Sequence, residues 1–217
     1  MKAGVMAGAL LLFVSTAVNS AVKESEEMTF DVAPGVRISL ENINGDITIA
    51  AGPGDKVQLV AYKKAGTQEY LDELQVVVDA DENYIRIETK HPKSEGGWFK
   101  WGKDSSGSVA YEIEVPYDVN LDTISTVNGD VQISAVGGSV KAETVNGSLK
   151  AIGLAGDVNL ETVNGSVRAE FDELGEGQRV NAEAVNGKIT LLVPANTSAR
   201  VNAETVNGSI NAEDFGL

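Results

Sequence analysis

The sequence has no cysteine and only one histidine, His91. Disulfide bonds, thiolate metal sites, thiol nucleophiles, lipid attachment through cysteine and metal sites built on several histidines are therefore excluded. Aromatic residues make up only 6% of the chain and prolines number 5, whereas glycines number 23. Because this balance suits many short strands and turns better than packed helices, we expect an all-β fold.

The first twenty residues have the composition of a secretory signal peptide. A basic start at Lys2 precedes an apolar stretch over residues 3–18, and small residues follow up to Ser20. The apolar stretch is shorter than the ~20 residues that span a bilayer, which makes a retained anchor the weaker alternative. We expect residues 1–20 to be cleaved, no transmembrane segment to remain, and the protein to be exported to the periplasm or the cell exterior.

The formal net charge is −15 at pH 7. Such a chain is repelled by nucleic acid and by anionic membrane surfaces, so we expect no nucleic-acid partner. The sequence contains neither a nucleophile-elbow motif nor a phosphate-binding glycine loop. These absences predict a non-enzymatic protein without a cofactor. A polysaccharide-cleaving enzyme is the enzymatic alternative, because carboxylates abound.

Six Asn-Gly pairs mark an internal repeat. Apolar residues recur two apart before each pair, as at Val140 and Ala142, and two apart after it, as at Leu149 and Ala151. The one exception is Asp122, which takes the first apolar position of the copy around Asn128. A fifth apolar residue, such as Val145, comes directly before each Asn-Gly. From the second pair on, the pairs are 18 to 22 residues apart, and they lie at Asn44, Asn128, Asn146, Asn164, Asn186 and Asn207.

This spacing predicts a β-solenoid over residues 121–217, with the Asn-Gly of each TVNG-type segment forming a corner between two short strands. We expect all five apolar positions, including Val145, to point inward, and the corner to use the left-handed backbone that Asn and Gly tolerate. We also expect the stacked asparagines to form a hydrogen-bonded ladder. Because Asn-Gly is also a hairpin signal, an antiparallel β-sandwich or meander is the alternative.

Residues 21–120 carry one copy of the repeat and otherwise alternate like ordinary strands, so we expect them to cap or extend the stack within the same domain. Residues 90–103 form a locally basic loop that contains Trp98, Phe99 and Trp101. This aromatic loop is a candidate contact for a glycan or an envelope protein. A satellite hydrophobic cluster is the structural alternative.

A glutamate begins each of the last four repeats of the hexapeptide ETVNGS and its near copy EAVNGK. The four glutamates share one position next to an inward residue, so we expect them to point outward as a column of like charges about 5 Å apart. Neighbouring cations such as Lys141, Lys150 and Arg168, a calcium ion or a cationic partner would offset their repulsion. This candidate acidic binding stripe, for which a solvated acidic surface is the alternative, consists of Glu143, Glu161, Glu183 and Glu204.

Three segments carry a family resemblance: TFDVAPGVRISLENINGDITI at residues 29–49, VPYDVNLDTISTVNGDV at residues 115–131, and the tandem TVNGS units. The chain resembles the bacterial envelope proteins grouped as "putative adhesins", also called the toast-rack family of unknown function. The resemblance implies a solenoid-like stack of strands and an exported location, and it brings no catalytic residues. We therefore expect a structural or binding module of the cell envelope, with an accessory of an envelope-stress signalling system as the alternative.

Overall fold

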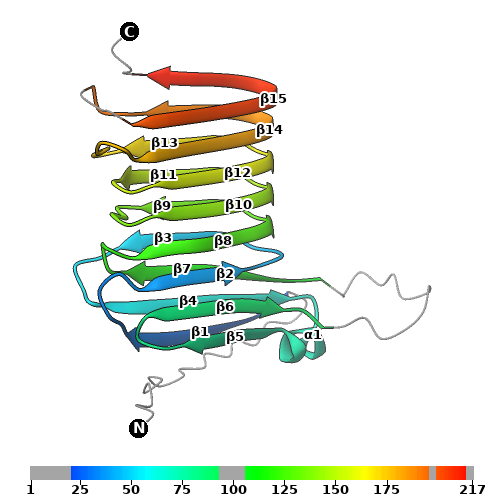
Figure 1. Cartoon of the computed structure of the whole chain (residues 1–217). Coiled ribbons are helices and arrows are strands. Elements are labelled where there is room, and N and C mark those ends of the chain that lie inside the picture. Colours follow the sequence, from blue (N-terminus) through cyan, green and yellow to red (C-terminus); the bar gives the residue numbers. More distant parts are fainter. Residues whose placement is uncertain (1–20, 93–105, 196–198, 214–217) are drawn as a thin grey trace.

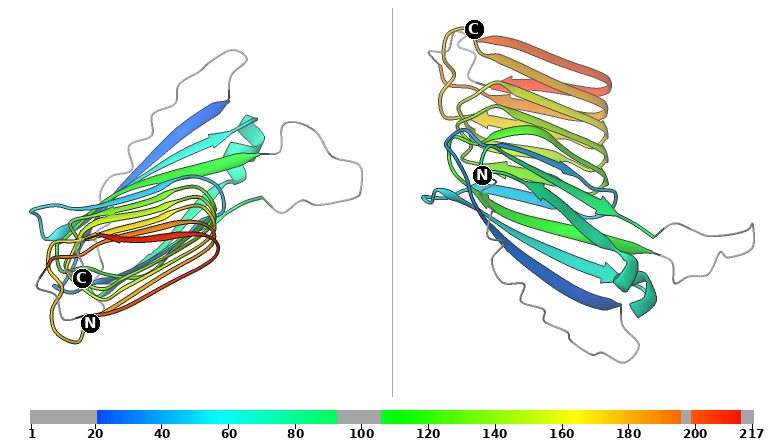
Figure 2. Two further views of the ribbon diagram at one scale, coloured as in Figure 1. Left: turned by 90° about the horizontal axis from the view of Figure 1, so that it is seen from above. Right: turned by 60° about the horizontal axis from the view of Figure 1, so that its bottom comes forward.

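The computed structural model describes residues 21–92, 106–195 and 199–213. Its strands lie in two layers that face each other across one hydrophobic core (Figures 1 and 2). The prediction of an all-β fold is confirmed. The first layer contains, in spatial order, β1 (Val22–Asp31), β4 (Lys56–Ala65), β7 (Gly107–Val115), β3 (Ile47–Ala51), β9 (Val131–Ser134), β11 (Leu149–Leu154) and β13 (Val167–Phe171).

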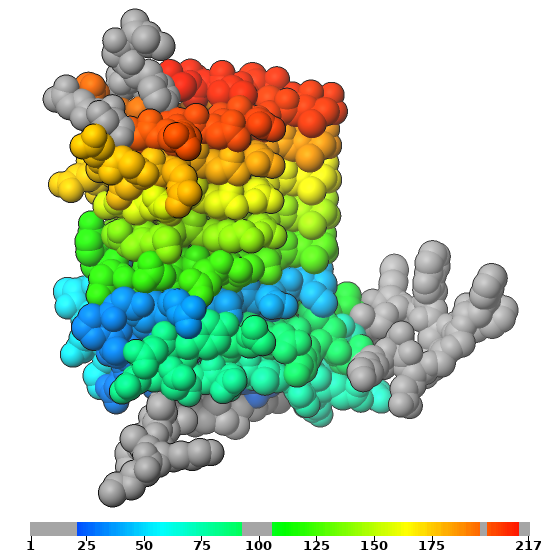
Figure 3. All heavy atoms as spheres, in the orientation of Figure 1, coloured from blue at the N-terminus to red at the C-terminus, as the bar shows by residue number. Residues whose placement is uncertain are grey.

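The second layer is built from the partner strands of the same repeats. It contains β5 (Gln75–Ala80), β6 (Tyr84–Lys90), β2 (Arg37–Glu41), β8 (Asn120–Asn128), β10 (Val140–Asn146) and β12 (Val158–Asn164). The long strands β14 (Arg179–Leu192) and β15 (Arg200–Glu213) bend at their Asn-Gly, so that each contributes the part before the bend to the second layer and the part after it to the first. Each repeat is thus one rung of the stack, and the rungs appear as parallel bands in Figure 3.

Successive rungs pair in parallel and in register, so that equivalent residues lie above one another. Val140 pairs with Val158, and Asn146 pairs with Asn164. The strands before and after a corner, such as β10 and β11, pair with neighbouring rungs and not with each other. The described strands of the repeats therefore show none of the antiparallel pairing of a meander.

The segment between the first and second Asn-Gly extends the stack downward. β2 and β3 form the rung around Asn44, and β6 and β7 pair in parallel with them. The residues between β6 and β7 contain no Asn-Gly. Trp98, Phe99 and Trp101 belong to this segment and lie outside the described residues, so their role stays a prediction.

Antiparallel strands end both layers below this rung, since β4 pairs with β7 and β1, and β5 pairs with β6. The short helix α1 (Gln68–Glu73) begins at its cap Thr67, whose side chain accepts from the amide of Tyr70, and buries Leu71. Lys63 is buried between β1 and β4, where Glu24 and Glu26 pair with it at 3.4 and 2.7 Å.

The interior differs from the prediction at the position before each Asn-Gly. In β10 the alternation of buried and exposed residues continues from Val140 through Ala142 to Thr144, which is 4% exposed, while Val145 is 40% exposed. The prediction that Val145 and its equivalents point inward is wrong: in β10 the alternation continues unbroken up to the corner, and the equivalent residues are likewise 38% to 75% exposed. The buried hydroxyl of Thr144 is satisfied by the carbonyl oxygen of Gly129, at 3.0 Å.

The corner glycines are required for space and not for an unusual backbone. Gly45 is the only glycine of the six Asn-Gly pairs with a positive φ, at 125°. A Cβ added to Gly165 would lie 1.9 Å from the carbonyl oxygen of Gly147 in the rung below, and the same close approach recurs at the other stacked corners. The prediction of left-handed corners is therefore wrong for these rungs, where closely stacked backbones exclude any side chain.

The asparagine ladder is confirmed. From Asn128 upward, each corner asparagine donates from Nδ2 to Oδ1 of the asparagine below it, over distances of 2.8 to 3.0 Å. The ladder runs from Asn44 to Asn207 and fixes the register of the corners along the whole stack.

Candidate functional site

The four predicted glutamates form a column on the outer face of the second layer. Glu143 pairs with Glu161, Glu161 with Glu183, and Glu183 with Glu204 in the parallel register. Each lies between two inward residues, so strand alternation turns its side chain outward. The structure thus brings together all four residues of the acidic stripe, whose binding role stays a prediction.

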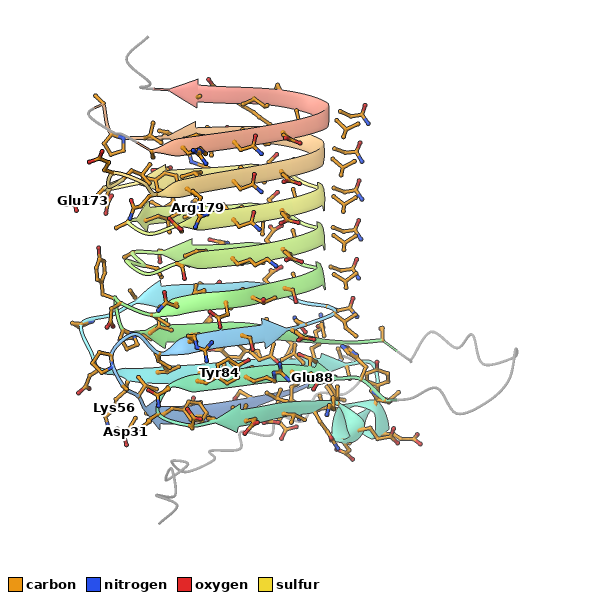
Figure 4. The ribbon with its side chains drawn as sticks, viewed as in Figure 1. Asp31, Lys56, Tyr84, Glu88, Glu173 and Arg179 are labelled. Carbon is orange, nitrogen blue, oxygen red and sulfur yellow. The ribbon has the colours of Figure 1, made fainter. Side chains whose placement is uncertain are left out.

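Two further glutamates, which sequence reasoning missed, continue the column below Ser125. Glu41 pairs with Ser125 on one side and with Glu88 on the other. The signal for Glu41 was available, because it comes three residues before Asn44, as Glu143 comes three residues before Asn146. Glu88, labelled in Figure 4 on β6, precedes no Asn-Gly, so only the pairing of β6 with β2 reveals its place.

Each glutamate of the upper column is contacted by the residue two positions before it on the same strand. Lys141 pairs with Glu143 at 2.8 Å. In the next three rungs an asparagine amide replaces the lysine and donates to the glutamate at 2.7, 2.9 and 3.3 Å. These three asparagines form a second ladder, and they are Asn159, Asn181 and Asn202.

Cations therefore neutralise only part of the column. The hydrogen bond with Glu143 raises the pKa of Lys141, and the negative charge of Glu143 is the second largest cause of this rise. Arg168, expected to help, pairs instead with Glu170 on β13 of the first layer, and Lys150 lies on β11 of the same layer. The partners of Glu161, Glu183 and Glu204 named above are neutral amides, which satisfy the oxygens but leave the charge.

A column of apolar side chains runs beside the glutamates. It lies two residues further along each strand and therefore on the same outer face. Its exposed fractions range from 38% at Val127 to 75% at Val206. The column supplies six of the nine exposed large hydrophobic residues in the described part of the chain, and it consists of Ile43, Val127, Val145, Val163, Val185 and Val206.

The upper parts of the two columns, from Glu143 to Glu204 and from Val127 to Val206, line one open groove with a volume of about 430 Å³. Buried threonines such as Thr144 and Thr162 lie between the columns, and Asn42 lines the groove at the lower end. Asn42 is 5% exposed and donates from Nδ2 to the carbonyl oxygens of Val109 and Gly45, whereas its Oδ1 accepts no hydrogen bond. The groove thus offers carboxylates beside a strip of methyl groups.

The glutamates of the column lie one above another in a single row. Within the described residues, no group of three or more Asp, Glu or His side chains is arranged to hold a metal ion. The calcium site considered from the sequence remains an untested hypothesis. Nor does that part of the chain contain a helix long and apolar enough to span a membrane.

No known protein family and no curated protein matches the sequence. Several solved structures resemble the fold. A "putative cell adhesion protein" from Clostridium sporogenes has 13% identity and a TM-score of 0.44, and the match covers 87% of this chain and 98% of that one. A "putative adhesin" from Bacteroides fragilis has 15% identity, a TM-score of 0.43 and coverages of 87% and 96%.

A third structure, a "putative lipid binding protein" from Parabacteroides distasonis, has 16% identity, a TM-score of 0.34 and coverages of 87% and 94%. Two of these three proteins bear adhesion names, as does the family that the sequence resembles. At these identities and TM-scores the likeness transfers no role to any residue of this chain.

Proposed function

We propose that this chain is an exported, non-enzymatic binding module of the bacterial cell envelope, adhesin-like in its action. Its contact surface is the groove between the glutamate and valine columns, and its partner is a protein that presents a cationic, partly apolar segment. The observation that carries the proposal is the alignment of the two columns, one charged and one apolar, over successive rungs of a single groove.

The apolar column separates this proposal from a merely solvated acidic stripe. An outward valine contributes nothing to the core, and contiguous exposed apolar surface typically marks an interaction site. Burying each half-exposed valine against a partner would contribute roughly 1 kcal/mol or less, which becomes substantial over several rungs.

The charge of the groove selects the partner. Adjacent glutamates repel one another, and a cationic segment relieves this repulsion in addition to forming its own ion pairs. Glu161, Glu183 and Glu204 accept hydrogen bonds from asparagine amides, which leave their negative charges in place. The net charge of −15 attracts the same partner over longer distances.

The test uses a synthetic twelve-residue peptide of alternating Lys-Lys and Val-Val pairs, an order that places lysines and valines on the same face of an extended chain. The peptide is titrated into the protein by isothermal calorimetry. We expect binding that weakens as salt rises, and about a tenfold loss of affinity in the Glu161→Gln/Glu183→Gln variant. The matched control is Glu69→Gln/Glu73→Gln, which removes two charges on α1 and should bind like the wild type. Equal losses of affinity in both variants would show that binding depends only on the net charge of the protein.

The groove variant also serves to test for a glycan partner. Binding on a glycan array that is lost in a Trp98→Ala/Trp101→Ala variant and kept in Glu161→Gln/Glu183→Gln would place the contact on the aromatic loop. That result would overturn the assignment of the groove as the contact surface.

A further inference from the structure

Among the described residues, the inward side chains of the last strand, β15, are less covered than those of the strands below it. Among the described strands β15 pairs only with β14, so one of its long edges has no strand beside it. The inward residues of β14 are buried because β15 covers them, with Ile189 0% exposed, whereas Ile210 in the same position of β15 is 47% exposed. The inward residues left half-buried or exposed in β15 are Val201, Ala203, Thr205, Ile210 and Ala212.

At the opposite end of the stack, the β1 edge is protected. The edge strand β1 carries Lys23, Glu24, Glu26 and Glu27 among its ten residues, and charged edges discourage strand pairing. Between its terminal residues Arg200 and Glu213, β15 has a single charged residue, Glu204. A long, weakly charged edge beside less covered inward side chains is the kind of surface that accepts another strand.

We propose that β15 pairs antiparallel with β15 of a second copy, so that two stacks join end to end around a twofold axis. The bent strand consists of one arm before the corner, residues 200–206, and one arm after it, residues 209–213. A twofold rotation about an axis parallel to the arms places each arm over the opposite arm of the other copy. Because the arms run in opposite directions, both contacts are antiparallel and the interface is self-complementary.

One register of this antiparallel pairing places inward residues opposite inward residues and outward residues opposite outward residues. With Asn207 opposite Gly208 of the second copy, Ala203 faces Ala212 and Thr205 faces Ile210, all of them inward positions, so the two cores become continuous. On the outer face Glu204 lies opposite Asn211. The dimer therefore ends the column of like charges that parallel stacking continues, in which Glu183 lies against Glu204.

A filament is the competing arrangement, in which β15 of one copy would pair with β1 or β5 of the next. Head-to-tail contacts of that kind do not close. The charged β1 edge opposes such a contact, and β1 and β4 run obliquely below the rungs (Figure 2). The twofold arrangement uses the long β15 edge on both copies and closes after two.

Sedimentation equilibrium of the exported chain tests the proposal. We expect twice the monomer mass at micromolar concentration, and at least a tenfold weaker dimer in Ile210→Lys, with far-UV circular dichroism confirming that the variant is folded. The control Tyr62→Lys changes a side chain of similar exposure, 43%, on β4 and should leave the dimer intact. A monomeric wild type, an open-ended series of masses, or a dimer indifferent to Ile210→Lys would each overturn the proposal.

The absence of native cysteine permits a second measurement that does not depend on destabilising the edge. Asn207→Cys places a thiol beside the proposed axis and should form an intermolecular disulfide on mild oxidation, whereas Asn146→Cys, in the same position three rungs below, should not. Equal cross-linking of both variants would contradict the twofold contact. Groove variants such as Glu161→Gln/Glu183→Gln should remain dimeric, so this inference and the proposed function can fail separately.

Discussion

Thr162 donates a hydrogen bond from Oγ1 to the carbonyl oxygen of Gly147, at 2.9 Å, and so ties its strand to the corner of the rung below. Thr144 and Thr126 make the same bond to Gly129 and Gly45, at 3.0 and 3.2 Å. Thr162 is only 4% exposed, so its hydroxyl is a buried polar group that needs this partner. The threonine of ETVNGS is thus an internal link between repeats.

Replacement of this link should cost stability in proportion to one buried hydrogen bond. Thr162→Val keeps the shape and removes the donor, and we expect a loss of about 1 kcal/mol in the free energy of unfolding, measured by urea denaturation. Ala184 occupies the equivalent position without a hydroxyl, so Ala184→Thr should gain up to about 1 kcal/mol. An unchanged midpoint in both variants would show that the bond adds nothing.

The stacked corners should tolerate no side chain. In Gly165→Ala the new methyl meets the backbone oxygen of Gly147, which already accepts the hydrogen bond of Thr162, so we expect destabilisation of roughly 3 kcal/mol or more. Gly54→Ala is the control, because an added Cβ there finds its nearest atom at 3.9 Å and φ is not positive. Similar thermal unfolding of the two variants would contradict the spatial explanation for the corner glycines.

Alkaline pH should weaken the fold through Tyr111. Burial raises the pKa of its hydroxyl to about 12, while the hydrogen bond with Thr89, at 2.7 Å, lowers it by a smaller amount. Because the folded pKa lies above the unfolded value of about 10, the neutral form stabilises the fold below pH 10, and this contribution disappears as pH rises to 12.

The corresponding loss is at most about 2.7 kcal/mol for a shift of this size. Chemical denaturation between pH 9 and 12 should therefore show a steep decline that is shallower in Tyr111→Phe. Parallel declines in both proteins would assign the effect to other groups.

The repeat made most of the fold accessible from sequence. The spacing around Asn146 and its equivalents was sufficient to predict short strands, outward glutamates and an amide ladder. Because the repeats stack in register, equivalent residues have the same surroundings in successive rungs. The direction of Val145 was mispredicted because its apolar character was given more weight than its place in the alternation of the strand. Ala142 and Thr144 are two apart, and strand alternation alone would have placed the threonine inside and the valine outside.

Other features required three dimensions. The place of Glu88 depends on the pairing of β6 with β2, which no spacing in the sequence announces. The partners of the glutamates were misjudged for a similar reason, since Arg168 is close in sequence but lies in the other layer. The groove itself became visible only when the valines proved to be exposed beside the glutamates.

The most direct test of the central claim replaces the valines and keeps every charge. The Val163→Ser/Val185→Ser variant retains the glutamate column, and its exposed positions contribute little to the core, so its unfolding midpoint should stay close to that of the wild type. If the two columns act as one binding surface, calorimetry with the lysine–valine peptide should show about tenfold weaker binding. Unchanged affinity would contradict the account and leave the column as an acidic stripe alone.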